Sequence, residues 1–411
     1  MQQPELEEMK KQVISSIEMS EETSDERLHE VIDDVLGGYM KTSHLTVRER
    51  CSYHKKLFDQ IRGLGILDEL LENKNITEIM INGPNSIFVE EQGRIRELEM
   101  DLLGYTAESL NHLVQKIVGK NNRRVNESNP IADTRLEDGS RVNIVLSPIA
   151  IDGTAVTIRK FPERQITIRD LIQWGSITKE AADFLQTMVE CGYNIFVSGG
   201  TGSGKTTFLN VLSNFIPKEE RIITIEDSAE LQLREIRNLI RMETRQKNIE
   251  GENEITIRDL IRTSLRMRPD RIIVGEVRGP ETLDMLQAMN TGHDGSMSTG
   301  HANSPGDMIS RLETMVLMGI EMPLSAIRAQ IASSIDLIVH LGRVRDKTRK
   351  VLEIDEVLGV RNHEIQLQTL FLFEEEQENK NEVNGKLKKK HELTHQEKLI
   401  SHGVHLKIHE H

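Results

Sequence analysis

Short apolar runs alternate with helix-like segments through the second half of the chain. Between residues 176 and 345 the runs are NIFVSG, RIITIED, RIIVGEV, MSTGH and DLIVHLGRV. Fully apolar strands separated by helices are typical of a parallel sheet that is covered on both faces. The pattern therefore predicts a doubly wound α/β core, and KVLEIDEVLGV and EIQLQTLFLFE are expected to add a terminal hairpin.

Residues 61–160 mix the periods of helix and strand. SIFVEEQGRIREL alternates about Gly93 and predicts a hairpin, whereas SLNHLVQKIVGK has helical spacing. RVNIVLSPIAIDGTAVTIRKF predicts two further strands joined by a glycine-containing turn. We expect a smaller α/β domain here, followed by a linker over residues 161–175 that permits the domains to move.

The two ends of the chain differ from the rest in composition. Residues 1–60 are rich in Glu and Lys with apolar residues at helical spacing, which predicts a helical extension packed on the next domain; docking of a partner is the alternative. Beyond the core domain of residues 176–373 come charge runs and six of the fourteen histidines. Residues 374–411 are expected to form a disordered tail, because irregular histidine spacing does not favour a metal site.

Composition and charge exclude several classes of protein. No run approaches the ~18 apolar residues of a membrane span, and the first residues, MQQPELEEMKK, lack the pattern of a secretory signal, so we expect a cytosolic protein. The two cysteines, Cys51 and Cys191, provide neither a disulfide framework nor a metal cluster. The net charge of −14 and the aromatic content of 3% disfavour nucleic acid as the main partner.

The segment SGGTGSGKTT predicts a phosphate-binding loop. It fits GxxxxGK[ST], a strand ends before it at Val197, and the helix FLNVLSNF begins after it. Backbone N–H groups of such a loop and the helix N-terminus surround phosphates. We expect Lys205 to meet the β- and γ-phosphates of ATP and the Thr206 hydroxyl to bind Mg²⁺. The predicted nucleotide-binding residues are Gly199, Gly200, Thr201, Gly202, Ser203, Gly204, Lys205, Thr206 and Thr207.

Acidic residues follow two of the predicted strands. Glu276 comes after the strand RIIV and a small Gly275, so we interpret it as the general base that activates water. Many strands of this kind end in a metal-binding aspartate, but Gly275 occupies that position here. We therefore expect Glu226, in ITIEDSAE, to assist Mg²⁺ and water. Taken alone, each of these acidic residues would be expected in a surface turn or a helix cap.

Histidines and arginines complete the candidate site. His293 and His301 lie in the polar segment TGHDGSMSTGHANSP, and we expect both at the carboxyl edge of the sheet, where they sense the γ-phosphate or contact a neighbouring subunit. Arginine stabilises the charge that develops during phosphoryl transfer. Arg141 and Arg159, in the smaller domain, are candidates to close the site; in isolation they would be exposed strand arginines.

Four ordered motifs carry a family resemblance: GGTGSGKTT, TIEDSAELQL, LRMRPDRIIVGEVRGPE and TGHDGSMSTGHANSP. Together they closely resemble the secretion ATPase superfamily, the motors of type II and type IV secretion and of type IV pili. The set is most similar to the CpaF-type ATPase of tight-adherence (Tad/Flp) pilus assembly, from about residue 60 to 345. Gly300 stands where many relatives have a bulkier residue. The lack of a cysteine quartet disfavours the zinc-bearing type II secretion branch.

The resemblance implies a RecA-like P-loop core behind a smaller α/β domain, assembled as a homo-hexamer on the cytoplasmic face of an inner-membrane platform protein. It implies Mg²⁺-dependent ATP hydrolysis that drives pilus assembly, with membrane association only through partners. Carried over by position, Gly199 to Thr206 form the Walker A motif, Glu226 lies in the Asp-box and Glu276 is the Walker B glutamate. His293 and His301 belong to the His-box, and Arg141 and Arg159 match the arginines of the N-terminal domain.

Two other functions remain open at this point. One is a secretion or conjugation motor that moves another protein or DNA rather than pilin. The other is a nucleotide-dependent scaffold without enzymatic activity, which the presence of Lys205, Thr206 and Glu276 disfavours.

Overall fold

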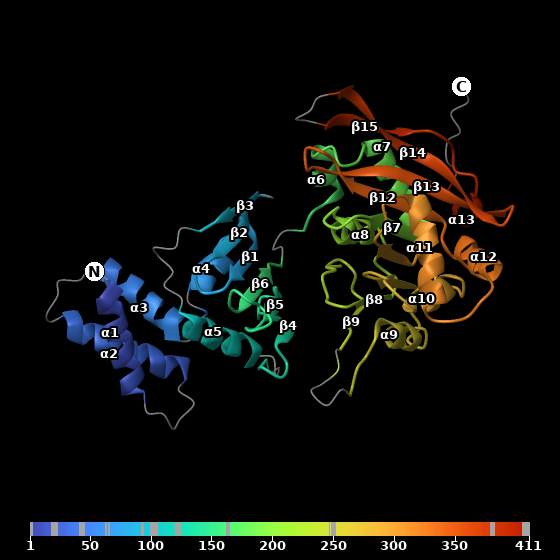
Figure 1. Ribbon diagram of the computed structural model, residues 1–411. Coiled ribbons are helices and arrows are strands. Elements are labelled where there is room, and N and C mark those ends of the chain that lie inside the picture. Colours follow the sequence, from blue (N-terminus) through green and yellow to red (C-terminus); the bar gives the residue numbers. More distant parts are fainter. Residues whose placement is uncertain are drawn as a thin grey trace. The chain divides into compact units, whose positions relative to one another are not determined.

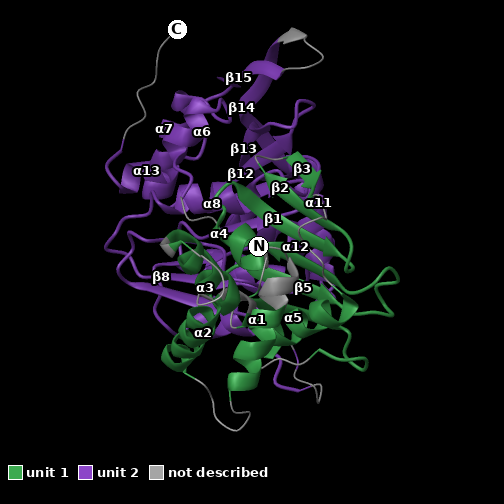
Figure 2. Ribbon diagram, turned by 90° about the vertical axis from the view of Figure 1, so that its left-hand side faces the viewer, with its two compact units in different colours: residues 1–164 green, residues 165–411 purple. Residues whose placement is uncertain are grey.

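The chain forms two compact units, Met1–Arg164 and Gln165–His411, in the computed structural model (Figures 1 and 2). The structure describes residues 3–17, 24–40, 46–61, 64, 66–91, 94–98, 106–119, 125–161, 165–245, 247, 252–378 and 383–404. The boundary between the units lies within the predicted linker 161–175, but the second half of that segment folds as α6 (Ile168–Gln173). Thr167 and Asp170 cap this helix through reciprocal hydrogen bonds.

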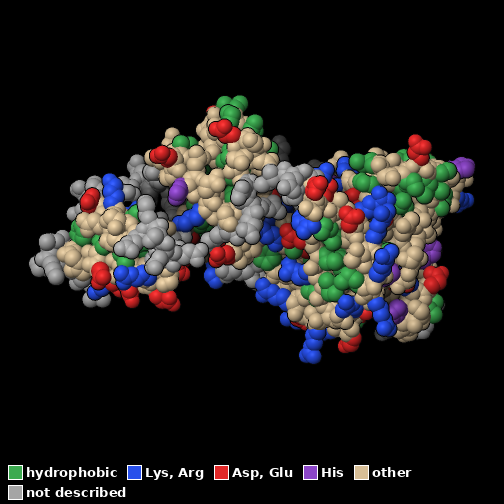
Figure 3. Space-filling view, turned by 90° about the horizontal axis from the view of Figure 1, so that it is seen from below, with side chains coloured by type: hydrophobic (Ala, Val, Ile, Leu, Met, Phe, Trp, Pro, Cys, Tyr) green, Lys and Arg blue, Asp and Glu red, His purple; other side chains and the backbone are tan. Residues whose placement is uncertain are grey.

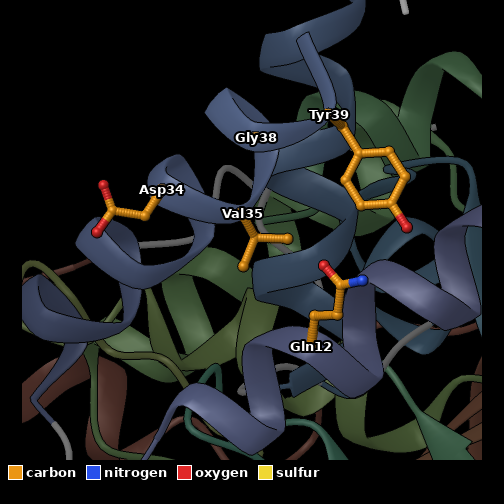
Figure 4. Close-up of a pocket in the computed structure, with 5 residues that line it drawn as sticks. All are labelled: Gln12, Asp34, Val35, Gly38 and Tyr39. Atoms are coloured by element: carbon orange, nitrogen blue, oxygen red, sulfur yellow. The ribbon is translucent and has the colours of Figure 1, made fainter. Parts of the chain in front are cut away.

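The first unit begins with a small helical bundle. Helices α1 (Gln3–Ser16), α2 (Asp25–Met40) and α3 (Val47–Ile61) follow the helical spacing of the sequence. Their apolar faces form a core of their own, made of Met9, Val13, Leu28, Val31, Ile32, Leu36 and Leu57. The helices therefore pack on one another, and α3 also contacts the elements that follow it, through the ion pair of Lys55 with Glu72 and the hydrogen bond from Lys116 to the carbonyl of Ile61. An open pocket of about 400 Å³ between α1 and α2 is lined by Gln12, Asp34, Val35, Gly38 and Tyr39 (Figure 4).

The rest of the first unit is an antiparallel sheet with the strand order β3-β2-β1-β6-β5-β4. The strands are β1 (Ile76–Asn82), β2 (Ile87–Glu91), β3 (Arg94–Glu97), β4 (Ile131–Arg135), β5 (Arg141–Val145) and β6 (Ala155–Arg159), with helices α4 (Ile66–Glu72) and α5 (Ala107–Gly119). Both predicted hairpins, β2–β3 and β5–β6, are confirmed. Buried Val142 and Ile144 alternate with exposed Arg141 and Asn143, so one face of the sheet packs in the core and the other is polar.

The second unit is built on a nine-stranded sheet with the order β15-β14-β13-β12-β7-β11-β10-β8-β9. Its strands are β7 (Ile195–Gly199), β8 (Ile222–Glu226), β9 (Leu239–Glu243), β10 (Arg271–Val274), β11 (Met297–Gly300), β12 (Leu337–Arg343), β13 (Arg349–Arg361), β14 (Glu364–Glu378) and β15 (Val383–Lys389). Strands β7 to β12 pair in parallel, whereas β13, β14 and β15 add in antiparallel fashion. The predicted α/β class, the five apolar strands and the β13–β14 hairpin are confirmed; the edge strand β9 was not predicted, because LIRME is only half buried.

Helices cover both faces of this sheet, as the fully apolar strands require. They are α7 (Lys179–Glu190), α8 (Lys205–Ser213), α9 (Ile257–Ser264), α10 (Glu281–Met289), α11 (Pro305–Leu317), α12 (Leu324–Ser334) and α13 (Glu397–Ser401). In β7, Ile195 and Val197 face a core that includes α7 and α8, whereas Phe196 faces the core formed with α9 to α12. Because β7 to β12 are parallel, their carboxyl ends meet at one edge of the sheet. The sheet itself lies between two layers of helices (Figure 1).

The prediction of a disordered tail is wrong for the part of residues 374–411 that the structure describes. β15 pairs with β14, and Lys386 and Lys388 of β15 form ion pairs with Glu376 and Glu374 of β14. The two charge runs have opposite signs and lie on adjacent strands, so they stabilise the pairing instead of preventing it. Val383, Leu387, Leu393 and Leu399 are buried. Residues 379–382 and 405–411 lie outside the described part.

The C-terminal segment around α13 is held by contacts with residues that precede the parallel strands. Lys398 of α13 forms ion pairs with Asp336 (2.8 Å) and Asp294 (2.9 Å), and the Tyr193 hydroxyl donates to the carbonyl of His395. These contacts fix the segment against the start of the parallel strands.

Among the described residues, no three His, Cys, Asp or Glu side chains form a group that could hold a metal ion, and no helix is long and apolar enough to cross a membrane.

Candidate functional site

The glycine-rich loop connects β7 to α8 at the carboxyl edge of the sheet. Gly202 and Gly204 have φ values of +71° and +94°, which a residue with a side chain rarely adopts. At Gly199 a Cβ would lie 2.4 Å from the carbonyl oxygen of Leu341, so close packing against β12 also requires glycine. The glycine pattern thus follows from the backbone path of a phosphate-binding loop and not from flexibility.

Lys205 begins α8 and turns back over the loop. Its side chain is largely buried, and its Nζ donates to the carbonyls of Gly199 and Gly200, at 3.0 Å each. Burial lowers the pKa of Lys205, while the Glu276 carboxylate opposes this shift. The result is a partly desolvated cation at the start of a helix, a position suited to bind phosphate oxygens.

Glu276 lies between two basic side chains just beyond β10. Its Oε1 is 2.8 Å from Nε2 of His301, and its Oε2 accepts a hydrogen bond of 2.7 Å from Arg278. On the other side of the imidazole, Nδ1 of His301 lies 3.3 Å from Nζ of Lys205. Lys205, His301 and Glu276 therefore form a continuous chain, from the loop to the predicted general base.

The protonation of His301 follows from this chain. An ammonium group has no acceptor, so Nδ1 of His301 accepts from Lys205 and the ring proton lies on Nε2, the nitrogen that is 2.8 Å from Oε1 of Glu276 without forming a hydrogen bond to it. This assignment requires a neutral imidazole. Burial accordingly lowers the pKa of His301, although the Glu276 carboxylate acts in the opposite direction.

Glu226 ends β8, beside β10. It is only 3% exposed, and its Oε1 accepts from the backbone N–H groups of Glu230 (2.8 Å) and Leu231 (3.0 Å). Burial raises the pKa of Glu226 to about 7 despite these bonds. A Cβ at Gly275 would lie 2.9 Å from Cγ of Glu226, so the glycine next to Glu276 makes room for this carboxylate.

These groups fit the chemistry of magnesium. Mg²⁺ prefers hard oxygen ligands, which the Thr206 hydroxyl and the Glu226 carboxylate provide. A cation would also favour the ionised form of a carboxyl group whose pKa is raised to about 7 by burial. The two backbone hydrogen bonds hold Oε1 of Glu226 and orient the group for such a role.

The expectation that both histidines lie at the carboxyl edge is wrong for His293. His293 precedes β11, and its Nδ1 is 3.2 Å from the carbonyl oxygen of Ala288. Two residues later, the N–H of Gly295 donates to the side chain of Asn194, which stands directly before β7. His293 therefore lies at the amino edge, because the whole length of β11 separates it from His301.

The predicted arginines lie side by side in the first unit. Arg141 is the register partner of Arg159 on one side and of Arg135 on the other, so the three occupy one row across β4, β5 and β6. Arg141 and Arg159 are exposed on the polar face, and Nε of Arg159 is 3.7 Å from Glu78. The sheet thus presents a row of guanidinium groups, a type of group that binds phosphate well.

Comparison with known proteins identifies the family. Residues 60–395 match the type II/IV secretion system protein family. The chain belongs to this family. It is 34% identical over 301 residues to a Mycobacterium tuberculosis protein named for conjugal transfer, covering 72% of this chain and 84% of that protein. It is 33% identical over 305 residues to the type IV secretion system protein PtlH of Bordetella pertussis, covering 68% of this chain and 89% of PtlH.

Solved structures show the same fold. The pilus retraction motor PilT with bound ADP has a TM-score of 0.53 and 23% identity, over 74% of this chain and 81% of PilT. The ATPase DotB of Legionella pneumophila has a TM-score of 0.50 and 23% identity, over 71% of this chain and 80% of DotB. The core is RecA-like, as predicted, and this secretion-family protein is an ATPase.

The site of this secretion ATPase also contains residues that the sequence did not indicate. Arg278 holds Glu276 and follows it by two positions, so the motif itself could have suggested it. Nε of Arg349, on β13, donates to the carbonyl of Gly202 at 2.9 Å, although 147 positions separate them. His340 of β12 contacts Ser198 directly before the loop. No local pattern could reveal Arg349 and His340. They reach the loop only because β12 pairs with β7 and β13 pairs with β12.

Proposed function

We propose that this ATPase hydrolyses ATP with Glu276 as the general base. The observation that carries the proposal is the position of Glu276: Arg278 donates a hydrogen bond to it, and His301 lies between it and Lys205. A carboxylate that is held in this way is oriented before substrate binds, which general base catalysis requires. His301, with a proton on Nε2, is positioned to respond to the γ-phosphate through Lys205.

The other residues bind and orient the nucleotide. The backbone of Gly199 to Thr207 surrounds the phosphates, and Lys205 exchanges the carbonyls of Gly199 and Gly200 for phosphate oxygens. Thr206 and Glu226 would hold Mg²⁺, which neutralises charge on the β- and γ-phosphates when it is bound. We leave His293 out of this catalytic set, because it lies at the amino edge; contact with a neighbouring subunit is the role that fits its position.

Arg141 and Arg159 are proposed to complete the site from the first unit. Their row on the polar face presents several N–H donors to an anion. We infer that ATP binding draws this face over the phosphates and that hydrolysis releases it. In a homo-hexameric ring such movements would pass from subunit to subunit and push a membrane-embedded partner.

The proposed output is assembly of a Tad/Flp-like pilus through an inner-membrane platform protein, with this chain at its cytoplasmic face. Four ordered motifs, from Gly199 to Pro305, support the similarity to CpaF-type ATPases. The net charge of −14 disfavours direct handling of DNA.

The second candidate is a motor for type IV secretion or conjugation. The first observation in its favour is that two relatives are named for conjugal transfer and for type IV secretion. The second is that many Lys and Arg side chains lie on the face of the second unit seen in Figure 3, and basic faces bind nucleic acid.

Purification of the chain from cells with ATP, followed by identification of the membrane protein that is retained, separates the two candidates. A pilus platform protein supports the first candidate, and a secretion-channel or DNA-transfer protein supports the second.

The general base is tested by Glu276→Gln. The amide keeps the shape of the side chain but cannot take a proton, so we expect phosphate release to fall about 100-fold or more while nucleotide affinity is retained. Glu321→Gln changes an exposed carboxylate elsewhere in the same unit and is the matched control. Normal turnover in Glu276→Gln would remove Glu276 from the role of base.

A further inference from the structure

The β12–β13 hairpin contacts the phosphate-binding loop at two points. The carbonyl of Leu341, on β12, packs so closely against Gly199 that a Cβ would not fit there. On β13, Nε of Arg349 donates to the carbonyl of Gly202 at 2.9 Å. A Cβ at Gly204 would lie 3.4 Å from Cδ of Arg349, so the aliphatic part of this side chain also packs on the loop. A change in the shape of the loop therefore displaces the hairpin or breaks these contacts.

The next two residues of β13 bind a different segment, the α6 turn (residues 174–176), which follows α6. Lys350 is 6% exposed, and its Nζ donates to the carbonyl of Gly175 at 3.1 Å. The backbone N–H of Val351 donates to the carbonyl of Ser176 at 2.8 Å. Carbonyl groups just beyond a helix have no partner within it, so these two bonds fasten the turn to the strand.

The α6 turn lies close in sequence to the boundary between the two units. The second unit begins at Gln165, and α6 begins at Ile168. Gly175 has a φ of +65°, which suits a sharp turn, and Trp174 beside it is 55% exposed. Little more than one short helix therefore separates the turn from the end of the first unit along the chain.

We propose that Arg349 is a positioning residue for the phosphate-binding loop and that, with Lys350 and Val351, it couples the loop to the α6 turn. Neighbouring residues of a strand lie only about 3.3 Å apart along its axis. Pairing with β12 keeps these three residues in register, so a shift of Arg349 moves the two residues that bind the turn. Arg349 touches the loop and not the reacting atoms. The inference rests on the proposed binding of nucleotide by the loop.

Trp174 is a natural reporter of the α6 turn. It is the one tryptophan of the chain, so tryptophan fluorescence of the full-length protein follows this turn alone. We expect its emission to change when ADP and Mg²⁺ are added, and to saturate with the Kd that calorimetry gives. Lys350→Met removes the bond to Gly175 but leaves the contacts of the loop. It should reduce the emission change by about half or more while the Kd for ADP stays within about twofold of wild type.

The contact with the loop is tested by Arg349→Met, which keeps the length of the side chain and removes the donor. Arg349 is exposed, so the core stays intact. We expect the affinity for ADP to fall about 10-fold, because a hydrogen bond from a charged group is lost, and the emission change at saturating ADP to disappear.

Arg343→Met is the matched control. Arg343 is the register partner of Arg349 and carries the same charge, but its Nε donates to the carbonyl of Lys347 at 3.2 Å instead of the loop. Its affinity for ADP and its emission change should stay within about twofold of wild type, since only a short bond inside the hairpin is lost.

Amide hydrogen exchange without nucleotide tests the same contacts independently. Arg349→Met should speed exchange about threefold or more in peptides that cover residues 199–207 and 174–176, whereas Lys350→Met should do so only in the second peptide. Arg343→Met should change neither.

The outcomes separate the coupling from the proposed function. If emission still changes fully in Arg349→Met and Lys350→Met, nucleotide affects Trp174 by another route and the coupling through β13 is overturned. Unchanged emission in a wild-type protein that binds ADP, or an equal loss in Arg343→Met, also overturns it. If wild type binds no ADP, the proposed function fails, and hydrogen exchange still decides whether Arg349 links the loop to the turn.

Discussion

At the scale of single residues, the site depends on side chains that fit around one another at two strand ends. Gly275 is small because the Glu226 side chain occupies the space where a Cβ would stand. Glu226 is in turn oriented by the amides of Glu230 and Leu231. A glycine that interrupts an otherwise apolar strand therefore has a steric explanation in the carboxylate of the neighbouring strand.

Gly275→Ala tests this packing. The new methyl group would stand 2.9 Å from Cγ of Glu226 and push its carboxylate away from the two amides. We expect a loss of about 1–3 kcal/mol in the free energy of unfolding, as for other overpacked sites, and about 10-fold slower phosphate release. Gly37→Ala, where a Cβ meets nothing within 4 Å, is the control in thermal melting and turnover assays. Unchanged turnover in Gly275→Ala would show that the position of Glu226 is not critical.

At the scale of elements, the antiparallel strands β13, β14 and β15 extend the parallel core and carry polar residues into buried positions. Asp355 of β13 is 2% exposed and lies near Glu353, which accepts a hydrogen bond of 3.0 Å from Thr369 of β14. Burial raises the pKa of Asp355 to about 7, and the negative charge of Glu353 is the second contribution to this shift. The extension is therefore expected to respond to pH near neutrality.

Asp355→Asn tests this response. An aspartate has a pKa of about 3.9 in the unfolded chain, so between pH ~4 and ~7 the folded state binds more protons and the free energy of unfolding falls as pH rises. The variant lacks this titration. It should match wild type near pH 4 and be more stable by roughly 1 kcal/mol or more at pH 8, measured by urea unfolding. Asp183→Asn, at an exposed ion pair with Lys179, should show no such pH-dependent gain. Equal stabilities at pH 8 would contradict the raised pKa.

At the scale of the whole molecule, the two units carry complementary chemistry. The second unit holds the phosphate-binding loop and Glu276, and the first presents the row of Arg135, Arg141 and Arg159. The proposed motor uses both, because Arg278 is bound to Glu276 and Arg349 to the carbonyl of Gly202, so arginines of the first unit would add positive charge for the γ-phosphate in the transition state. Conversion of hydrolysis into movement would then follow from arginines that bind only while the γ-phosphate is present.

Arg141→Ala tests whether the first unit contributes to catalysis. Removing a transition-state contact lowers kcat without an equal loss of ground-state binding, so we expect turnover to fall about 100-fold while the affinity for ADP changes less than about threefold. Arg94→Ala, an exposed arginine on β3 at the opposite edge of the same sheet, is the matched control. Equal activity of Arg141→Ala and wild type would exclude Arg141 from the site.

Local patterns determined most of the architecture. The apolar runs around Val197, Ile223, Ile273 and Val339 are long enough and apolar enough to require burial on both sides, which fixes a parallel sheet under two helical layers. The spacing of glycines and Lys205 is equally local, since the loop closes within ten residues. Charge runs misled the prediction at the C-terminus, because their pairing across β14 and β15 depends on strand contacts and not on composition.

The sequence by itself thus determined the α/β core, the phosphate-binding loop and the candidate base, because neighbours in the chain create each of them. Only the tertiary structure decided which distant side chains meet. The length of β11 places His293 and His301 at opposite edges, and the pairing of β12 with β7 brings His340 to Ser198 across 142 positions. Register and strand order are collective properties of the packed sheet, so no single segment contains them.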